Sequence, residues 1–234
     1  MARGKKRRRN GAILIGVLLF GVVFFVRWME ANRCKTCGID VSHYQGEIDW
    51  EKVAGEDIGF VFIKASEGTD LADTLFKRHW EGAGEAGILR GAYHFFRPGR
   101  DAEAQARQFL AVTEGLEAEL PPVLDVEVRD KQSAAVVRAG VREWMEVVEE
   151  AVGRKPILYT MPKFADSYLG EDLGGYPLWV VDLRSGMPRM PKAWDGWVFR
   201  QYSHTGRLKG IKGDVDLDCF NGDLEELLRF SGSR

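Results

Sequence analysis

Two carboxylates stand two positions apart inside an apolar segment of this sequence. The segment Pro121–Val128 reads P-P-V-L-D-V-E-V and carries Asp125 and Glu127. Its composition is typical of a buried strand, in which side chains at positions i and i+2 point to the same face. Burying a charged group is unfavourable unless the charge is paired or neutralised. A same-face pair of acids in such a strand therefore indicates acid/base chemistry.

Further acids stand near the ends of other predicted strands: Asp40, Asp182, Asp214, Asp216 and Asp218. In parallel α/β barrels, functional groups gather where the strands end, and we expect all of these segments except that of Asp182 to meet at one mouth. A group of carboxylates beside Tyr and Trp side chains suits glycoside hydrolysis. One protonated acid donates to the leaving oxygen while another stays ionised, so their surroundings must separate their pKa values.

Other chemistries find little support in the sequence. The four histidines are scattered, without Cys or carboxylate at the spacing of metal ligands: His43, His79, His94 and His204. No G-x-S-x-G motif and no phosphate-binding loop is present. We therefore expect no metal and no cofactor.

Short apolar runs that alternate with amphipathic stretches must position these acids. Predicted strands cover Gly38–Ser42, Gly59–Ala65, Leu89–Phe96, Val123–Val128, Pro156–Thr160, Leu178–Asp182, Trp197–Tyr202 and Val215–Phe220. Predicted helices cover Asp49–Ala54, Thr74–Ala86, Asp101–Glu114, Ser133–Val152, Lys163–Leu169 and Asp223–Phe230. Helices follow the first five strands, whereas loops join the last three. The pattern predicts an α/β fold, a modified TIM-like (β/α)5(β)3 barrel.

The N-terminal part differs from the rest in charge and hydropathy. Six cations stand within residues 1–10, and no charge occurs over the 16 residues from Gly11 to Val26. We expect a basic cytoplasmic head at 1–10, a transmembrane anchor at 11–29, a linker at 30–37 and the barrel domain at 38–232. The apolar run is slightly shorter than the ~20 residues of a typical span.

The cations before the apolar run orient the N-terminus toward the cytoplasm. This predicts a single-pass protein of the bacterial inner (cytoplasmic) membrane, with its barrel domain periplasmic or extracellular. A cleavable signal segment at 11–29, giving a secreted protein, is the alternative, although no good small-x-small cleavage site follows. Because the whole chain carries a formal charge of −2, the part after the head carries about −8. This acidic balance argues against nucleic-acid binding, and we expect a monomer.

Three cysteines allow two plausible disulfides. Cys37 precedes the first predicted strand and Cys219 lies in the last, and these strands are neighbours in a closed barrel. A Cys37–Cys219 bridge is therefore one hypothesis, and a Cys34–Cys37 bridge is the other.

The order and content of the motifs resemble glycoside hydrolase family 25, the muramidases often called Chalaropsis-type lysozymes. The similar segments run through nearly all of 38–230: Gly38–Trp50, Phe60–Gly68, Gly91–Arg97, Pro122–Glu127, Pro156–Thr160, Pro177–Val180, Gln201–Ser203 and Gly213–Gly222.

The resemblance implies cleavage of the β-1,4 bond between N-acetylmuramic acid and N-acetylglucosamine in peptidoglycan. Glu127 matches the family's proton donor and Asp125 the acid that stabilises the charged intermediate. Asp40 and Asp216 match two further carboxylates of the site. The family's substrate contacts correspond to Tyr93, Tyr159, Trp179 and Gln201. A non-catalytic peptidoglycan-binding module on the same fold is the alternative function.

Three positions depart from the family's usual residues. Arg200 stands where a Trp is common, Asp218 where an Asn is common, and Val181 where an Ala is common. Asp218 would raise the pKa of nearby acids if it faced them, but we expect its side chain to point to solvent.

Overall fold

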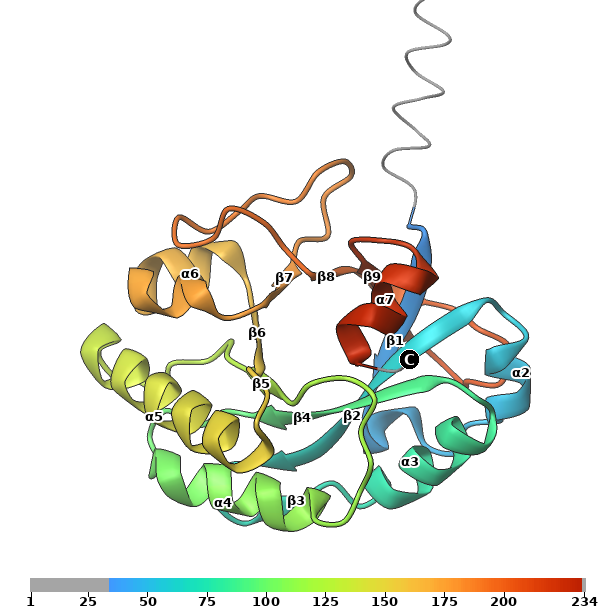
Figure 1. Cartoon of the computed structure of the whole chain (residues 1–234), viewed down its shortest axis with the longest axis horizontal. Coiled ribbons are helices and arrows are strands. Elements are labelled where there is room, and N and C mark those ends of the chain that lie inside the picture. The colour runs from blue at the N-terminus through green and yellow to red at the C-terminus, as the bar shows by residue number, and fades with distance from the viewer. Residues whose placement is uncertain (1–33, 233–234) are drawn as a thin grey trace, which may run out of the picture. The chain divides into compact units, whose positions relative to one another are not determined.

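The structure is a computed structural model that describes residues 34–232 (Figure 1). The predicted head at 1–10, the predicted anchor at 11–29 and the first part of the predicted linker lie outside the described residues. Among the described residues, no helix is long and apolar enough to cross a membrane.

Strands and helices alternate along most of the chain. The strands are β1 (Thr36–Val41), β2 (Ile58–Glu67), β3 (Leu71–Ala72), β4 (Leu89–Phe95), β5 (Val123–Asp125), β6 (Ile157–Thr160), β7 (Leu178–Val181), β8 (Phe199–Gly206) and β9 (Val215–Phe220). The α-helices are α2 (Trp50–Ala54), α3 (Phe76–Glu85), α4 (Ala102–Thr113), α5 (Ala134–Val152), α6 (Pro162–Tyr168) and α7 (Leu224–Ser231). Two 3₁₀ helices are η1 (His43–Gln45) and η2 (Glu171–Gly175).

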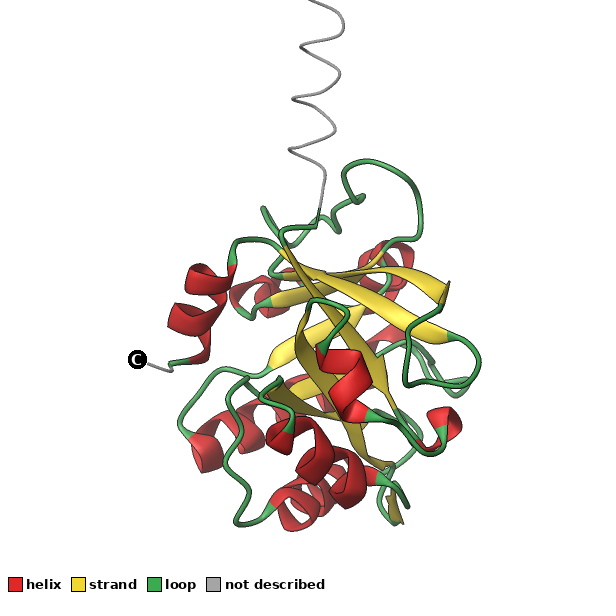
Figure 2. Cartoon of the chain, turned by 90° about the vertical axis from the view of Figure 1, so that its right-hand side faces the viewer, coloured by secondary structure: helices red, strands yellow, loops and turns green. Residues whose placement is uncertain are grey.

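Eight of these strands close into a barrel. Their order is β1-β9-β8-β7-β6-β5-β4-β2, and β2 pairs with β1 to complete the ring. Figure 2 shows the strands at the centre of the molecule with helices around them. The predicted α/β barrel is thus confirmed, including the lack of α-helices after β7 and β8. The last strand, β9, runs antiparallel to both of its neighbours, β8 and β1.

Side-chain caps fix the starts of several helices near their predicted positions. The side chains of Asp49, Asp101, Ser133 and Asp223 each accept a hydrogen bond from the third backbone N–H of the helix that follows. Such caps satisfy N–H groups that have no partner inside the helix. The long helix α5 ends at Gly153, whose φ of 68° glycine adopts without strain.

Several boundaries and short elements differ from the predictions. The strand β5 ends at Asp125 and not at Val128. After Asp125 the backbone is paired only on the side of β6, where the Val126 N–H donates to the Tyr159 carbonyl at 3.0 Å. β8 continues four residues past Tyr202, because its backbone stays paired with β9 up to Gly206. These four residues have no apolar pattern, so the sequence did not predict them as part of the strand. No pattern in the sequence predicted β3, η1 or η2.

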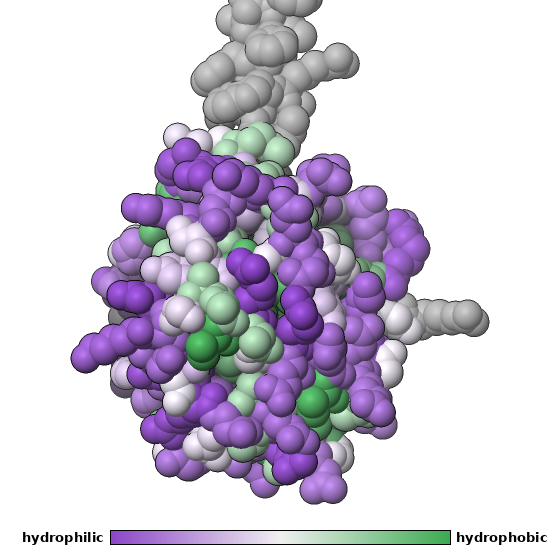
Figure 3. Space-filling view, turned by 90° about the vertical axis from the view of Figure 1, so that its left-hand side faces the viewer, coloured by the Kyte–Doolittle hydropathy of each residue, from purple (hydrophilic) through white to green (hydrophobic). Residues whose placement is uncertain are grey.

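The core has two layers, one inside the barrel and one between the barrel and its helices. The interior is filled by a cluster of large rings: Phe60, Phe62, Trp179, Phe199 and Phe220. Gly38 and Gly91 make room for them, because a Cβ at either position would lie 2.4 Å from a Phe ring atom. The outer layer includes Ile39, Val61, Ile63, Trp144 and Val148. The face in Figure 3 is mostly hydrophilic, with apolar side chains in small groups. Packed side chains therefore fill the interior of the barrel.

Candidate active site

The predicted acids come from strands on opposite sides of the barrel. Asp40 lies near the end of β1, and the antiparallel register places Asp216 directly across from it on β9. Asp125 is the last residue of β5. Because β9 is reversed, Asp216 lies near its beginning and still reaches the mouth. The barrel therefore brings Asp40, Asp125 and Asp216 together at its mouth.

Asp125 and Glu127 point to the same side of the chain. Between them, the Val126 side chain is fully buried in the outer core. In an extended chain its two neighbours then face the opposite way, toward the barrel mouth. Asp125 is 8% exposed, whereas Glu127 is half-buried. The half-buried Glu127 is thus the more accessible of the two acids.

Burial and mutual repulsion shape the ionisation of this pair. Burial, followed by repulsion from Glu127 and Asp40, raises the pKa of Asp125 well above its ordinary value. Burial and then repulsion from Asp216 raise the pKa of Glu127, and the Lys64 ammonium opposes both shifts. A raised pKa means that each carboxyl keeps its proton to a higher pH than a carboxyl in water.

Lys64 is a member of the site that the sequence analysis missed. Its side chain, on β2, is largely buried, and its Nζ donates to Glu67 Oε2 at 2.7 Å. The ammonium also lies 4.9 Å from the centre of the Phe95 ring. The available signal was a single cation in the apolar run F-V-F-I-K-A. A buried cation beside several carboxyls limits the repulsion among them.

A chain of hydrogen bonds fixes the orientation of Asp40. The Tyr159 hydroxyl donates to Gln201 Oε1 at 2.9 Å, and Gln201 Nε2 donates to Asp40 Oδ2 at 3.1 Å. Since the amide oxygen is taken by the tyrosine, the amide nitrogen faces the acid. Burial first, and then repulsion from Asp40 and Asp125, raises the pKa of the Tyr93 hydroxyl well above its ordinary value, as is expected of a tyrosine close to both acids.

Asp218 does not point to solvent, so that expectation was wrong. Its side chain is fully buried inside the barrel, where Oδ1 accepts a hydrogen bond from Trp179 Nε1 at 3.0 Å. A side-chain hydrogen bond also joins it to Asp40. Burial, with repulsion from Asp216, raises the pKa of Asp218 well above its ordinary value. Asp218 is inward because it shares the face of Asp216, two positions away in the same strand.

The four residues predicted to contact sugar differ in accessibility. Trp179 is 1% exposed and packs against Phe62, with ring centres 4.5 Å apart. Neither face of its ring is therefore exposed to a sugar. Trp179 instead contributes a hydrogen bond to the buried Asp218 carboxyl. Tyr159 and Gln201 are also buried, while Tyr93 is half-buried. Tyr93 is thus the most accessible of the four.

Two other acids, Asp182 and Asp214, lie apart from this group, so the expectation that Asp214 would join the mouth was wrong. Asp182 accepts hydrogen bonds from the guanidinium of Arg184 and from the Arg189 backbone, and the pairing with Arg184 holds its pKa well below the ordinary value. Asp214 is exposed and forms a 2.9 Å ion pair with Arg207. Both acids are therefore paired with arginines outside the group at the mouth.

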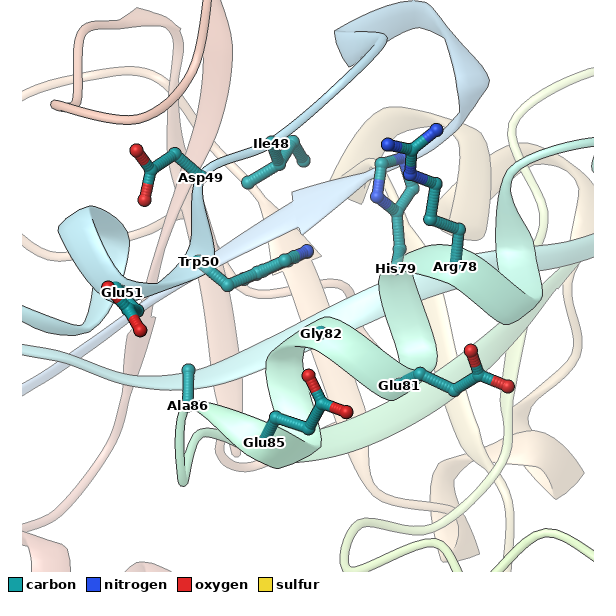
Figure 4. Close-up of a pocket in the computed structure, with 10 residues that line it drawn as sticks. All are labelled: Ile48, Asp49, Trp50, Glu51, Arg78, His79, Glu81, Gly82, Glu85 and Ala86. Carbon is teal, nitrogen blue, oxygen red and sulfur yellow. The ribbon is translucent and has the colours of Figure 1, made fainter.

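A pocket of about 390 Å³ lies away from the mouth, between the segment Ile48–Glu51 and helix α3. Figure 4 shows Trp50 lying across it above Gly82, with the acids Glu81 and Glu85 on the helix side. None of the acids assembled at the barrel mouth lines this pocket. We therefore assign the candidate active site to the mouth.

The chain is similar in sequence to several known proteins. The family model described as Glycosyl hydrolases family 25 matches residues 39–211. Lysozyme M1 of Streptomyces globisporus is 35% identical over 209 residues, which are 84% of this chain and 71% of the relative. The Uncharacterized protein YegX of Escherichia coli strain K12 is 43% identical over 200 residues, 82% of this chain and 72% of the relative.

Solved structures show the same similarity. The bacterial lysozyme from Streptomyces coelicolor superposes with a TM-score of 0.80 at 34% identity, covering 85% of this chain and 98% of the other. A family 25 glycosyl hydrolase from Bacillus anthracis gives a TM-score of 0.79 at 31% identity, covering 86% and 95%.

Proposed function

This chain belongs to glycosyl hydrolases family 25, and we propose that it is a peptidoglycan muramidase whose general acid is Glu127. It hydrolyses the β-1,4 bond between N-acetylmuramic acid and N-acetylglucosamine by carboxylate catalysis. The observation that carries the proposal is the placement of Asp125 and Glu127 on one side of the chain at the barrel mouth, both with raised pKa values.

Glu127 donates the proton to the leaving sugar oxygen. It is the more exposed acid of the pair, so it reaches a bound glycan more easily. Burial and the negative charge of Asp216 keep it protonated at higher pH, as a proton donor requires. Asp216 therefore acts through the ionisation of Glu127.

Asp125 stabilises the positive charge that develops at the sugar carbon. In the described residues, its Oδ1 has no hydrogen-bond partner, which leaves that oxygen available to the substrate. Without substrate, its deep burial favours the protonated form. Developing positive charge nearby favours the anion, and Lys64 favours it as well.

The reacting groups all come from one chain, so a monomer is sufficient for this chemistry. Asp40 is held by Gln201 beside Asp125 and helps to set the charge of the mouth. Tyr93, Tyr159, Trp179 and Gln201 shape the sugar site, with Tyr93 in direct contact and the other three behind it. No cofactor takes part.

The N-terminal segment places the enzyme at the membrane. Residues 11–29 anchor the chain, the basic head at 1–10 stays in the cytoplasm, and residues 38–232 form the catalytic domain on the side where peptidoglycan lies. The support for this is the run of six cations followed by 16 uncharged residues. A secreted form after cleavage is the alternative.

Mass spectrometry of digested peptidoglycan tests the proposed activity. Purified protein should release fragments whose new reducing ends are N-acetylmuramic acid. New N-acetylglucosamine reducing ends would assign a different glycosidase. Co-sedimentation with peptidoglycan without any new reducing ends would instead assign a binding module.

A further inference from the structure

Two cysteines lie opposite each other on the neighbouring strands β1 and β9. The register of β1 and β9 pairs Cys37 directly with Cys219. Directly opposite residues of an antiparallel pair have Cα atoms about 4.5–5.5 Å apart. Disulfides form at Cα separations of about 4.4–6.8 Å. The backbone therefore already has the spacing that a bridge requires.

The two side chains lie on the same face of the sheet. The neighbours of Cys219, Asp218 and Phe220, belong to the barrel interior, so Cys219 points outward. Cys37 is opposite Cys219 and therefore shares this outer face. Both cysteines are half-buried, so a small oxidant can reach them. The Cys219 thiol donates a weak hydrogen bond to the adjacent Phe220 carbonyl at 3.5 Å, which a rotation of the side chain would release.

A cation lies on the other side of Cys219. The register of β8 and β9 pairs Arg200 with Cys219, so a cationic residue stands beside the thiol on the neighbouring strand. The guanidinium is held in place by hydrogen bonds from Nε to the Asp182 carbonyl at 3.0 Å and from Nη1 to the Gly186 carbonyl at 2.5 Å. A neighbouring cation stabilises a thiolate, the form of cysteine that attacks disulfides.

We propose that Cys37 and Cys219 form a disulfide that joins β1 to β9 on the outside of the barrel. The oxidant is a disulfide, either of a protein or of a small molecule. The Cys219 thiolate attacks one of its sulfurs and expels the other as a thiolate. Cys37 then attacks the Cys219 sulfur in this mixed disulfide and expels the second thiolate. Two thiols lose two electrons and two protons, and the oxidant becomes two thiols.

The bridge would act on the strand pair that carries two acids of the mouth. Asp40 and Asp216 are opposite each other, three residues along β1 and β9 from the cysteines. A covalent link at Cys37 and Cys219 would hold the register of this pair. It would also close most of the described chain into one loop, which restricts the unfolded state.

Thiol mapping of the full chain in detergent tests the inference. The protein is incubated with glutathione disulfide, the remaining thiols are alkylated, and the digest is examined without reduction. We expect a linked Cys37–Cys219 peptide in the wild type and in Cys34→Ser, and none in Cys37→Ser. A Cys34–Cys37 or Cys34–Cys219 peptide, or alkylation of all three cysteines, would overturn the proposal.

Thermal unfolding of the same samples gives a second measurement. Oxidation should raise Tm by about 4 °C or more in the wild type and in Cys34→Ser. Cys37→Ser should show no such rise. An equal rise in Cys37→Ser would contradict the assignment. Neither measurement uses enzymatic activity, so each result is independent of the proposed function.

Discussion

At the level of single residues, Asp218 is the most unusual acid of the barrel. It lies fully buried between Trp179 and Asp40, and burial and repulsion raise its pKa. The folded protein is more stable when a carboxyl buried in this way is protonated, because burying its charged form is unfavourable. Above the pKa of the unfolded chain, folding must therefore take up a proton, and stability must depend on pH.

Replacing Asp218 by Asn should make the protein more stable at neutral pH. Asparagine keeps an oxygen for the Trp179 indole but does not ionise. The folded pKa of Asp218 is raised, so its stabilising contribution is complete below the unfolded pKa of about 3.9 and is lost as pH rises toward the folded pKa. The advantage of Asp218→Asn should thus grow between pH 4 and 7, by at most about 1.4 kcal/mol per pH unit.

Thermal unfolding at several pH values between 4 and 7 measures this effect. The matched control is Asp214→Asn, because Asp214 is an exposed acid that precedes the same strand. A Tm difference between Asp218→Asn and the wild type that stays constant with pH would show that Asp218 is ionised in the folded protein throughout.

Replacing Asp216 by Asn should move the alkaline limb of the activity profile to lower pH. The negative charge of Asp216 helps to raise the pKa of Glu127. Without it, Glu127 loses its proton at lower pH, and activity falls earlier as pH rises. The position of this limb in kcat/KM, measured against Asp214→Asn, provides the test. If the alkaline limb stayed at the same pH as in the wild type, Asp216 would have no effect on the ionisation of Glu127.

Two simple patterns in the sequence predicted a role for Asp125, Glu127, Asp40 and Asp216. The first is the same-face rule for alternate strand residues, and the second is the gathering of acids where strands end. The same-face rule also applies to Asp218, two residues from Asp216. Its depth in the barrel was not visible, because depth depends on strand direction and on the closure of the ring.

At the level of elements, helix starts were the most predictable features. Asp101 and Ser133 cap α4 and α5 at the positions where the sequence placed them. The reversal of β9 was not predicted, although residues 207–214 between β8 and β9 are too few for a parallel crossover of a dozen or more. Short elements such as β3 depend on pairing with a distant strand and leave no pattern of their own.

Replacing Gly91 by Ala should destabilise the barrel by about 1–3 kcal/mol. A Cβ at Gly91 would lie 2.4 Å from the Phe62 ring. That ring cannot move easily, since it packs against Trp179 and Phe199 at centre distances of 4.5 and 5.1 Å. Urea unfolding measures the change. Gly196→Ala is the control, because a Cβ there meets nothing within 4 Å, and equal stability of the two variants would contradict tight interior packing.

At the level of the whole molecule, the alternation of strands and helices and the order of the motifs were enough to predict the closed barrel. The register of the strands, the direction of β9 and the side chains that fill the barrel interior could be seen only in the structure. For the first 33 residues, which lie outside the described part, charge and hydropathy support the proposed anchor.

Membrane fractionation tests the proposed anchor. With an uncleaved anchor at 11–29, the full-length protein should remain with the membranes after alkaline carbonate extraction, and its N-terminal peptide should be detected. A carbonate-soluble protein whose first residue lies after residue 29 would establish signal cleavage in place of anchoring.

The most direct measurement is the rate at which Glu127→Gln releases reducing ends from purified peptidoglycan. A general acid typically contributes about 10²–10⁴-fold. We predict a loss of that size in Glu127→Gln, with unchanged co-sedimentation with peptidoglycan and a Tm close to that of the wild type. The control Asp214→Asn should retain nearly the full rate. A Glu127→Gln protein that turns over at the wild-type rate would contradict the assignment of Glu127 as the proton donor.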